Sequence, residues 1–119
     1  MNIEEYRIYC LSKKGVTESF PFDKSTLVFK VMGKMFALAD VDLFESINLK
    51  CDPEKAVELR EQFIGVLPGY HMNKQHWNTI LVDADVSEKM IFQLIDDSYE
   101  LIVKSLTKKL QNELINLNR

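Results

Sequence analysis

The chain has 119 residues, of which 46% are hydrophobic and 28% charged, a balance typical of one globular domain with its own core. Its formal net charge of −3 disfavours a dedicated nucleic-acid binder, so contact with DNA would require a local basic patch. The N-terminal residues are acidic and no apolar run is long enough to cross a bilayer. We therefore expect a single domain over residues 1–119, in the cytoplasm and without a membrane partner.

The first residues predict a helix. Asn2 and Glu5 have the spacing of a capping box, in which each side chain accepts a hydrogen bond from the other residue's backbone. Lys13-Lys14-Gly15 supply the cations and the glycine that are typical of a helix end. The helix is therefore expected to end near these residues, before a short extended piece around 17–22.

Short strands joined by tight turns are predicted next. Apolar residues alternate over 27–32, Gly33-Lys34 favours a hairpin, and a return strand is expected over 35–39. A further strand is predicted over 46–51, with Ile47, Leu49 and Cys51 facing inward. Consecutive strands of this kind indicate an antiparallel sheet, and with the predicted helices an α+β fold.

The second half predicts more helix and one more strand. Asp52-Pro53 combines a capping carboxylate with a proline at the first helical position, and Gly65 is expected to end that helix. A loop at Pro68-Gly69 precedes a strand predicted over 76–82. The last helical region is expected to open at 85–87, because apolar residues recur beyond it at helical spacing.

The two cysteines, Cys10 and Cys51, both fall on apolar stripes, where a small thiol is expected to be buried and unreactive. A disulfide is therefore not expected, which favours a reducing compartment. Neither thiol is a candidate nucleophile, and no serine or glycine-rich motif of a catalytic site is present. We expect a protein that is not an enzyme.

The segment 67–79 contains the only tryptophan, both histidines and no acidic residue. His71 and His76 are five residues apart, a spacing that suits metal chelation neither on a strand nor on a helix. No metal or other cofactor is therefore expected. A second motif, Asp96-Asp97-Ser98-Tyr99, follows downstream, and its carboxylates are expected to be solvated or to pair with lysines.

With these two motifs in this order and spacing, the chain resembles the MmcQ/YjbR family of small bacterial proteins over nearly its whole length. The resemblance implies a frataxin-like (CyaY-like) fold, in which helices cover an antiparallel sheet. It also implies DNA binding, the function with which the family is usually labelled. Family members commonly carry proline at the position of Thr107, so the sequence leaves open whether the last helix breaks there.

The DNA-binding interpretation rests on a loop and a hairpin. The loop offers hydrogen-bond donors, aromatic rings and a lysine without a repelling carboxylate, which suits contact with phosphate and sugar. The hairpin resembles one of two wings proposed for the family. The candidate residues for contact with double-stranded DNA are Lys30, Lys34, Tyr70, His71, Asn73, Lys74, His76 and Asn78.

Two other functions stay open at this point. One is a pocket for a small aromatic or anionic molecule, lined by Tyr70, Trp77 and Tyr99. The other is a protein-interaction module that uses the face of the sheet. Trp77 itself has two interpretations, a packing anchor on the last strand or a platform on which a base stacks.

Overall fold

The computed structural model describes residues 1–117, which form a six-stranded antiparallel sheet with helices packed on it. The strands lie in the order β1-β2-β3-β4-β6-β5, and every neighbouring pair is antiparallel. The predicted α+β class is confirmed. The elements are α1 (Ile3–Leu11), β1 (Val16–Ser19), β2 (Thr26–Val31), β3 (Lys34–Asp40), β4 (Ser46–Lys50), α2 (Pro53–Gln62), β5 (Val66–Pro68), β6 (Trp77–Leu81), α3 (Glu88–Ser105) and α4 (Lys108–Ile115).

The helices begin where capping residues predict. Asn2 and Glu5 form the expected capping box, with the Glu5 amide donating to Asn2 Oδ1 at 2.8 Å. Asp52 caps α2 with Pro53 at its first position, and Ser87 caps α3 through the Met90 amide. Thr107 caps α4, so the long helical region does break there, after Ser105.

Two details differ from the expected elements. Residues 66–68, expected to lie in a loop, form the edge strand β5, which pairs with β6. Cys51 lies just beyond the end of β4, where its side chain is half-buried and packs against the core, the side on which it was predicted to lie. Cys10 is fully buried, as predicted, and neither cysteine is in a disulfide.

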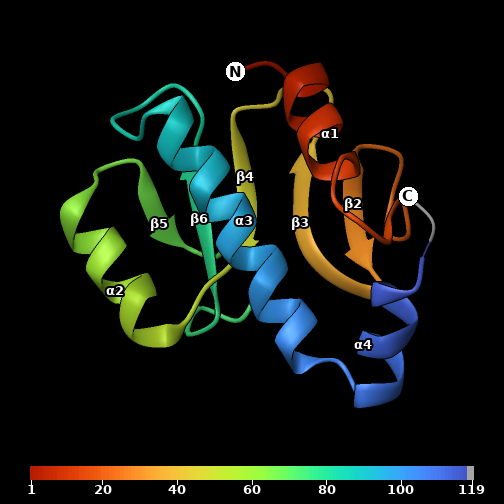
Figure 1. Ribbon diagram of the computed structural model, residues 1–119. Helices are drawn as coiled ribbons and strands as arrows, with labels where there is room; N and C mark the ends of the chain where they lie inside the picture. Colours follow the sequence, from red (N-terminus) through yellow and green to blue (C-terminus); the bar gives the residue numbers. More distant parts are fainter. Residues whose placement is uncertain (118–119) are drawn as a thin grey trace.

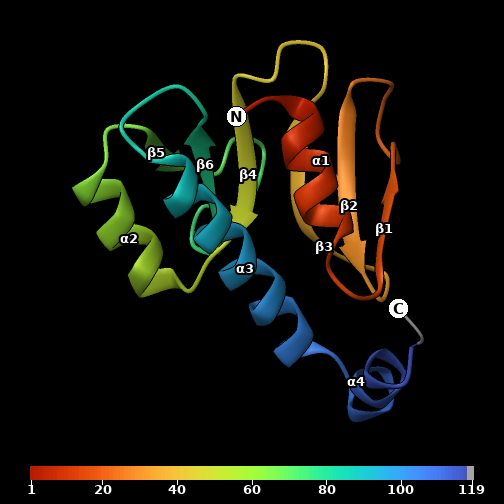
Figure 2. The same ribbon diagram turned by 45° about the horizontal axis from the view of Figure 1, so that its top comes forward.

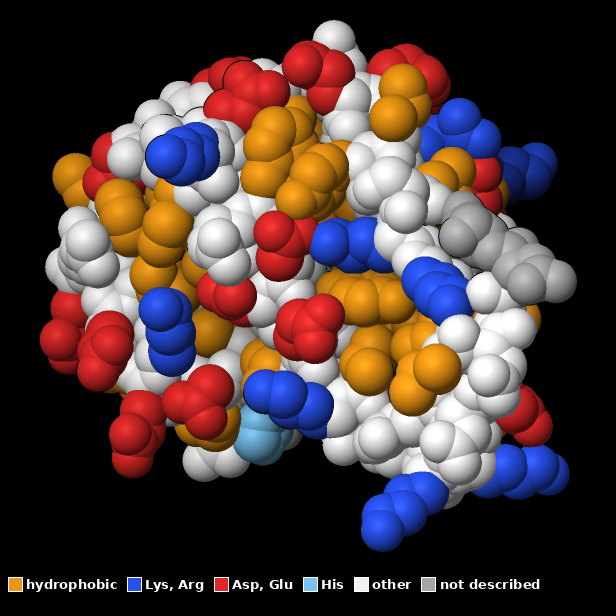
Figure 3. Space-filling view, viewed as in Figure 1, with side chains coloured by type: hydrophobic (Ala, Val, Ile, Leu, Met, Phe, Trp, Pro, Cys, Tyr) orange, Lys and Arg blue, Asp and Glu red, His pale blue; other side chains and the backbone are white. Residues whose placement is uncertain are grey.

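Helices α1, α2 and α3 cover one face of the sheet (Figures 1 and 2). The core between these layers includes Tyr6, Phe29, Phe36, Ile47 and Ile95, all with 0% of their surface exposed. Figure 3 shows the helix side from outside, where acidic and basic side chains are interspersed between hydrophobic ones. None of the helices in residues 1–117 has the length and apolar character that crossing a membrane requires.

The Asp-Asp-Ser-Tyr motif holds α3 in place. Asp96 accepts a hydrogen bond of 2.7 Å from the Tyr9 hydroxyl and forms an ion pair with Lys13, as expected of a lysine partner. The Tyr99 hydroxyl donates to the Lys14 carbonyl oxygen at 2.6 Å. These contacts tie α3 to α1 and to the turn that follows it, so the fold itself accounts for the motif.

Candidate functional site

The face of the sheet opposite the helices, here called the open face, carries the alternate side chains of each strand. Register places Thr26, Asp40 and Ser46 at one end of it, where β2 and β4 begin and β3 ends. Lys30, paired with Met35, and Lys50, paired with Trp77, lie at the other end. At about 3.3 Å per residue, the two ends are roughly 13 Å apart. The open face therefore has an acidic and a basic end.

The loop between β5 and β6, residues 69–76, folds over the open face. Its ends are closed by hydrogen bonds from the Gly69 amide to the Trp77 carbonyl and from the Trp77 amide to the Asn73 carbonyl, both 2.9 Å long. A Cβ atom at position 69 would lie 2.8 Å from Trp77 Cβ, so glycine is needed for this approach. Met72 then packs on a small apolar cluster of Val28, Leu38 and Trp77.

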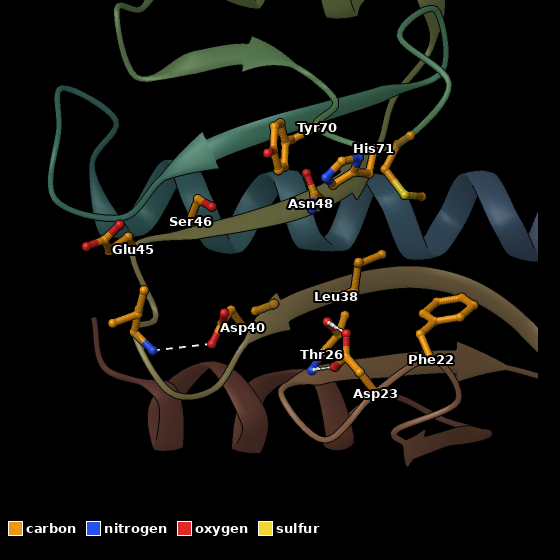
Figure 4. A pocket seen from close by; sticks show the side chains of 13 residues that line it. Phe22, Asp23, Thr26, Leu38, Asp40, Glu45, Ser46, Asn48, Tyr70 and His71 are labelled. Atoms are coloured by element: carbon orange, nitrogen blue, oxygen red, sulfur yellow. Dashed lines mark hydrogen bonds between the residues drawn. The ribbon is translucent and has the colours of Figure 1, made fainter.

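Between this loop and the one before β2 lies a groove of about 580 Å³. Figure 4 shows Tyr70 and His71 on one wall, Phe22 and Asp23 on the other, and Asp40 and Glu45 at one end. The groove is lined by Phe22, Asp23, Thr26, Leu38, Ala39, Asp40, Leu43, Glu45, Ser46, Asn48, Tyr70, His71 and Met72. Its size is in the range of small-molecule sites.

The floor of the groove is held by side-chain hydrogen bonds. Thr79 accepts from the Tyr70 amide at 2.9 Å, which fixes the start of the loop, and donates its hydroxyl to Asn48 Oδ1. No described residue bonds the Nδ2 group of Asn48, which lines the groove. A ligand in the groove would therefore find a positioned amide donor.

The charged groups of the lining are mostly negative. Asp23 accepts from the backbone amides of Thr26 and Ser25 at 2.7 and 2.8 Å, and these bonds hold the pKa of its carboxyl below the ordinary value of 3.8. Asp40 accepts from the amides of Asp42 and Leu43 in a similar turn. Both turns keep a carboxylate at the groove.

The structure separates the residues of the DNA-binding interpretation. Lys30 lies on the open face, whereas Lys34 pairs in register with Val31 and its Nζ lies 3.4 Å from the Ser105 carbonyl on the helix side. Lys74 donates its ammonium to the Gly69 carbonyl at 2.9 Å, within its own loop. The two lysines of the hairpin therefore lie on opposite faces of the sheet.

Two candidate asparagines have structural roles. Asn73 Oδ1 accepts from the Gln75 and His76 amides, a local turn that shapes the loop. Asn78 is 1% exposed and faces α2, where its amide donates to the Ala56 carbonyl. The inclusion of Asn78 among DNA contacts is thus corrected, because β6 alternation points it to the helix side.

The three rings of the expected pocket do not converge. Tyr70 is 68% exposed on the groove wall, but Trp77 is 7% exposed within the cluster under Met72. Tyr99 packs edge-on against Phe36 on the helix side of the sheet. The pocket therefore differs in composition from the one expected, and the burial of Trp77 favours packing over base stacking.

The groove residues that the sequence did not indicate come from the opposite wall and the floor. Asp23, Asp40, Glu45 and Asn48 are not among the candidate residues predicted for either function. The available signal was the polar, outward alternation of 46–50. Within residues 1–117 no three histidine, cysteine or acidic side chains are grouped so that they could hold a metal ion.

Known proteins are similar to this chain in sequence and in fold. The model of the YjbR family matches residues 11–101. "Uncharacterized protein YjbR" of Escherichia coli K12 is 34% identical over 118 residues, covering 98% of this chain and 100% of that one. "Uncharacterized protein YbdF" of Escherichia coli O157:H7 is 38% identical over 96 residues, covering 80% of this chain and 79% of that one. The crystal structure of Deinococcus radiodurans protein DR2400, a DUF419 domain, has a TM-score of 0.87 at 38% identity, covering 95% of this chain and 87% of that one.

Proposed function

The chain belongs to the YjbR family, and from that premise we propose that it is a non-enzymatic protein that binds a small molecule in the groove of the open face. The observation that carries this proposal is the groove of about 580 Å³ between two loops, whose lining combines apolar side chains such as Leu38 and Met72 with polar and acidic ones. The thiols support a role without catalysis, because burial raises the pKa of Cys10 to about 12 and that of Cys51 to about 11.

The test fills the groove with a side chain. Ser46 lies in the lining, so Ser46→Phe places a ring in the groove, and Glu58→Phe adds the same ring on the exposed surface of α2 as a control. The probe is the neutral fluorescent dye N-phenyl-naphthylamine, whose emission rises in apolar sites. We expect saturable binding to wild type and to Glu58→Phe, and binding to Ser46→Phe weakened by about tenfold or more. Equal binding to all three proteins would overturn the proposal.

Binding of duplex DNA is a second candidate, favoured by the position of Lys30 and Lys50 at the same, basic end of the open face. Lys74 and His76 are exposed in the part of the loop that leads into Trp77, the register partner of Lys50, and would add hydrogen-bond donors there, whereas Tyr70 and His71 are exposed on the wall of the groove. Lys34 would contribute only from the hairpin tip. The negative net charge of −3 and the separated lysines make DNA the less supported of the two functions.

A salt titration tests DNA binding. Each lysine that contacts a phosphate contributes about one to the slope of log affinity against log salt, so Lys30→Ala and Lys50→Ala are each expected to lower the slope by about that amount. Lys55→Ala is the control, because Glu54 and Glu58 flank it on α2. Binding that is absent at low salt, or lost equally in all three variants, would exclude the DNA interpretation.

Two further assignments accompany these proposals. The frataxin-like (CyaY-like) fold is supported by a single layer of helices on an antiparallel sheet. A cytoplasmic location is supported by two cysteines that are not paired with each other.

A further inference from the structure

The rim of the groove exposes apolar side chains. Phe22, Leu43 and Tyr70 are 65%, 70% and 68% exposed, and all three line the same groove. Exposed apolar groups gathered around one concavity mark a surface that a partner covers. The floor adds Leu38 and Met72, so the ligand is expected to have an apolar body.

The charge of the groove comes from carboxylates. Asp23, Asp40 and Glu45 line it, while among the described residues no lysine or arginine does, and the nearest candidate for a positive charge is His71. The backbone amides that hold Asp23 and Asp40 also keep these carboxylates near fixed positions. A ligand that carried a carboxylate or phosphate would be repelled by these three carboxylates.

The lysines of the open face do not cancel this charge. Lys30 and Lys50 lie at the far end, roughly 13 Å away along the strands. That separation exceeds the Debye length of about 8 Å at physiological ionic strength, so salt screens their effect on the acidic end. Within the lining of the groove, the formal negative charges are those of the three carboxylates.

We propose, on the basis of the function proposed above, that the groove selects organic cations in which an ammonium or guanidinium group is joined to an apolar body. The cation lies beside Asp40 and Glu45, where the charges are complementary. The body packs on Leu38 and Met72, between the side chains of Phe22 and Tyr70 on the two walls. The Nδ2 group of Asn48 provides one directed hydrogen bond to an acceptor in that body.

The test compares three probes of similar size that share a phenyl ring and differ in charge: phenethylamine, phenethyl alcohol and phenylacetate. Their binding is followed by chemical-shift titration of backbone amides in the full chain. The amine is expected to bind about tenfold more tightly than the alcohol, and the carboxylate more weakly than either. The shifts are expected to centre on residues 38–48 and 69–72, and the preference for the amine is expected to fall as salt is raised.

Matched variants assign the preference to the groove. Asp40→Asn with Glu45→Gln removes two negative charges there, and Asn keeps an oxygen to accept from the turn amides. Glu58→Gln with Glu61→Gln removes the same charge from α2 as the control. We expect the first pair to reduce the amine's affinity to that of the alcohol, with the alcohol unchanged, and the second pair to have no effect.

The outcomes separate the two proposals. If the alcohol binds in the groove but the amine is not preferred, or if both variant pairs change the amine equally, the charge selectivity is wrong while the groove remains a ligand site. If none of the three probes shifts the groove residues and the neutral dye also fails to bind, both proposals are overturned.

Discussion

The Ser98 hydroxyl lies between strands β3 and β4, where it accepts a hydrogen bond from the Lys50 amide at 2.9 Å and donates to the Phe36 carbonyl. The strands pair directly as far as Ala37 and Leu49, so the next pair in register would be Phe36 and Lys50. A side chain of α3 therefore replaces one rung of the ladder. This explains why a serine, 0% exposed, occupies a position of the apolar stripe of α3.

Removal of that hydroxyl is expected to destabilise the fold. Ser98→Ala leaves the Lys50 amide and the Phe36 carbonyl without their partner, and an unsatisfied buried group costs on the order of 1–3 kcal/mol. We expect the free energy of unfolding, measured by urea denaturation, to fall by roughly 2–3 kcal/mol. Ser105→Ala, at the exposed end of the same helix, is the control and is expected to cost less than about 0.5 kcal/mol. Equal losses of unfolding free energy in the two variants would mean that the hydrogen bonds of Ser98 to β3 and β4 add no stability.

The contacts of Asp96 with Lys13 and Tyr9 predict that Asp96→Ala destabilises the protein more than the same substitution at the adjacent Asp97. Asp96→Ala removes the ion pair and the hydrogen bond from Tyr9, and leaves Lys13, whose side chain is 16% exposed, above the rings of Tyr9 and Tyr99. Because the carboxylate is partly exposed, the expected loss in unfolding free energy is about 1–2 kcal/mol.

The adjacent carboxylate serves as the control for this prediction. Among residues 1–117, Asp97 accepts a hydrogen bond only from the side-chain amide of Gln93, one turn earlier on α3, so Asp97→Ala is expected to cost less than about 0.5 kcal/mol in the same denaturation experiment. A ranking in which Asp97→Ala is the more destabilising change would contradict the role given to Asp96.

Local patterns predicted most of the elements because their causes are local. Asn2 with Glu5, Asp52 with Pro53, and Gly33 act within a few residues of themselves, so spacing alone locates two helix starts and a hairpin. Strand β5 was missed because three residues that end in a proline carry no alternation, and only pairing with β6 makes them a strand.

The candidate site could not be predicted because it depends on distant segments. The walls of the groove are separated by about fifty positions in the chain, from Phe22 to Tyr70, and no spacing rule connects them. Whether a side chain points to the open face or to the helix side of the sheet also decides whether it is available for binding. Asn78 and Tyr99 belong to motifs that look functional in the sequence, but strand and helix geometry turns both toward the core.

The thiols are expected to differ in reactivity. Burial raises the pKa of Cys10 from the ordinary 9.0 to about 12, and that of the half-buried Cys51 to about 11. At neutral pH both are expected to react with a disulfide reagent more slowly than a free thiol, and Cys10 more slowly than Cys51. Urea is expected to make both react at the same rate. If Cys10 of the native protein reacts as fast as Cys51, the buried position of the Cys10 side chain on α1 is contradicted.

The same thiols predict a loss of stability in alkali. A group whose pKa is raised by folding stabilises the protein below its unfolded value, here 9.0, and this contribution is lost as the pH rises through the folded value. We therefore expect the unfolding midpoint in urea to fall between about pH 9 and pH 12. Cys10→Ala is expected to reduce the slope of this fall, and a slope unchanged by the substitution would remove Cys10 as a cause.

The break between α3 and α4 yields the last prediction. Thr107 has φ −62°, close to the value that proline requires, and Leu106 before it is extended, with ψ 155°, as the residue before a proline must be. Thr107→Ala removes the hydrogen bond that its hydroxyl accepts from the Leu110 amide and is expected to cost about 1 kcal/mol. Thr107→Pro loses the same hydrogen bond, but it restricts the unfolded chain, which returns about 0.4–1 kcal/mol of stability.

Thermal and urea unfolding are therefore expected to rank the stability of the proline variant between wild type and the alanine variant. Asn112→Ala, on the exposed side of α4, is the control. A proline variant less stable than the alanine variant would show that the backbone at Thr107 differs from the one described.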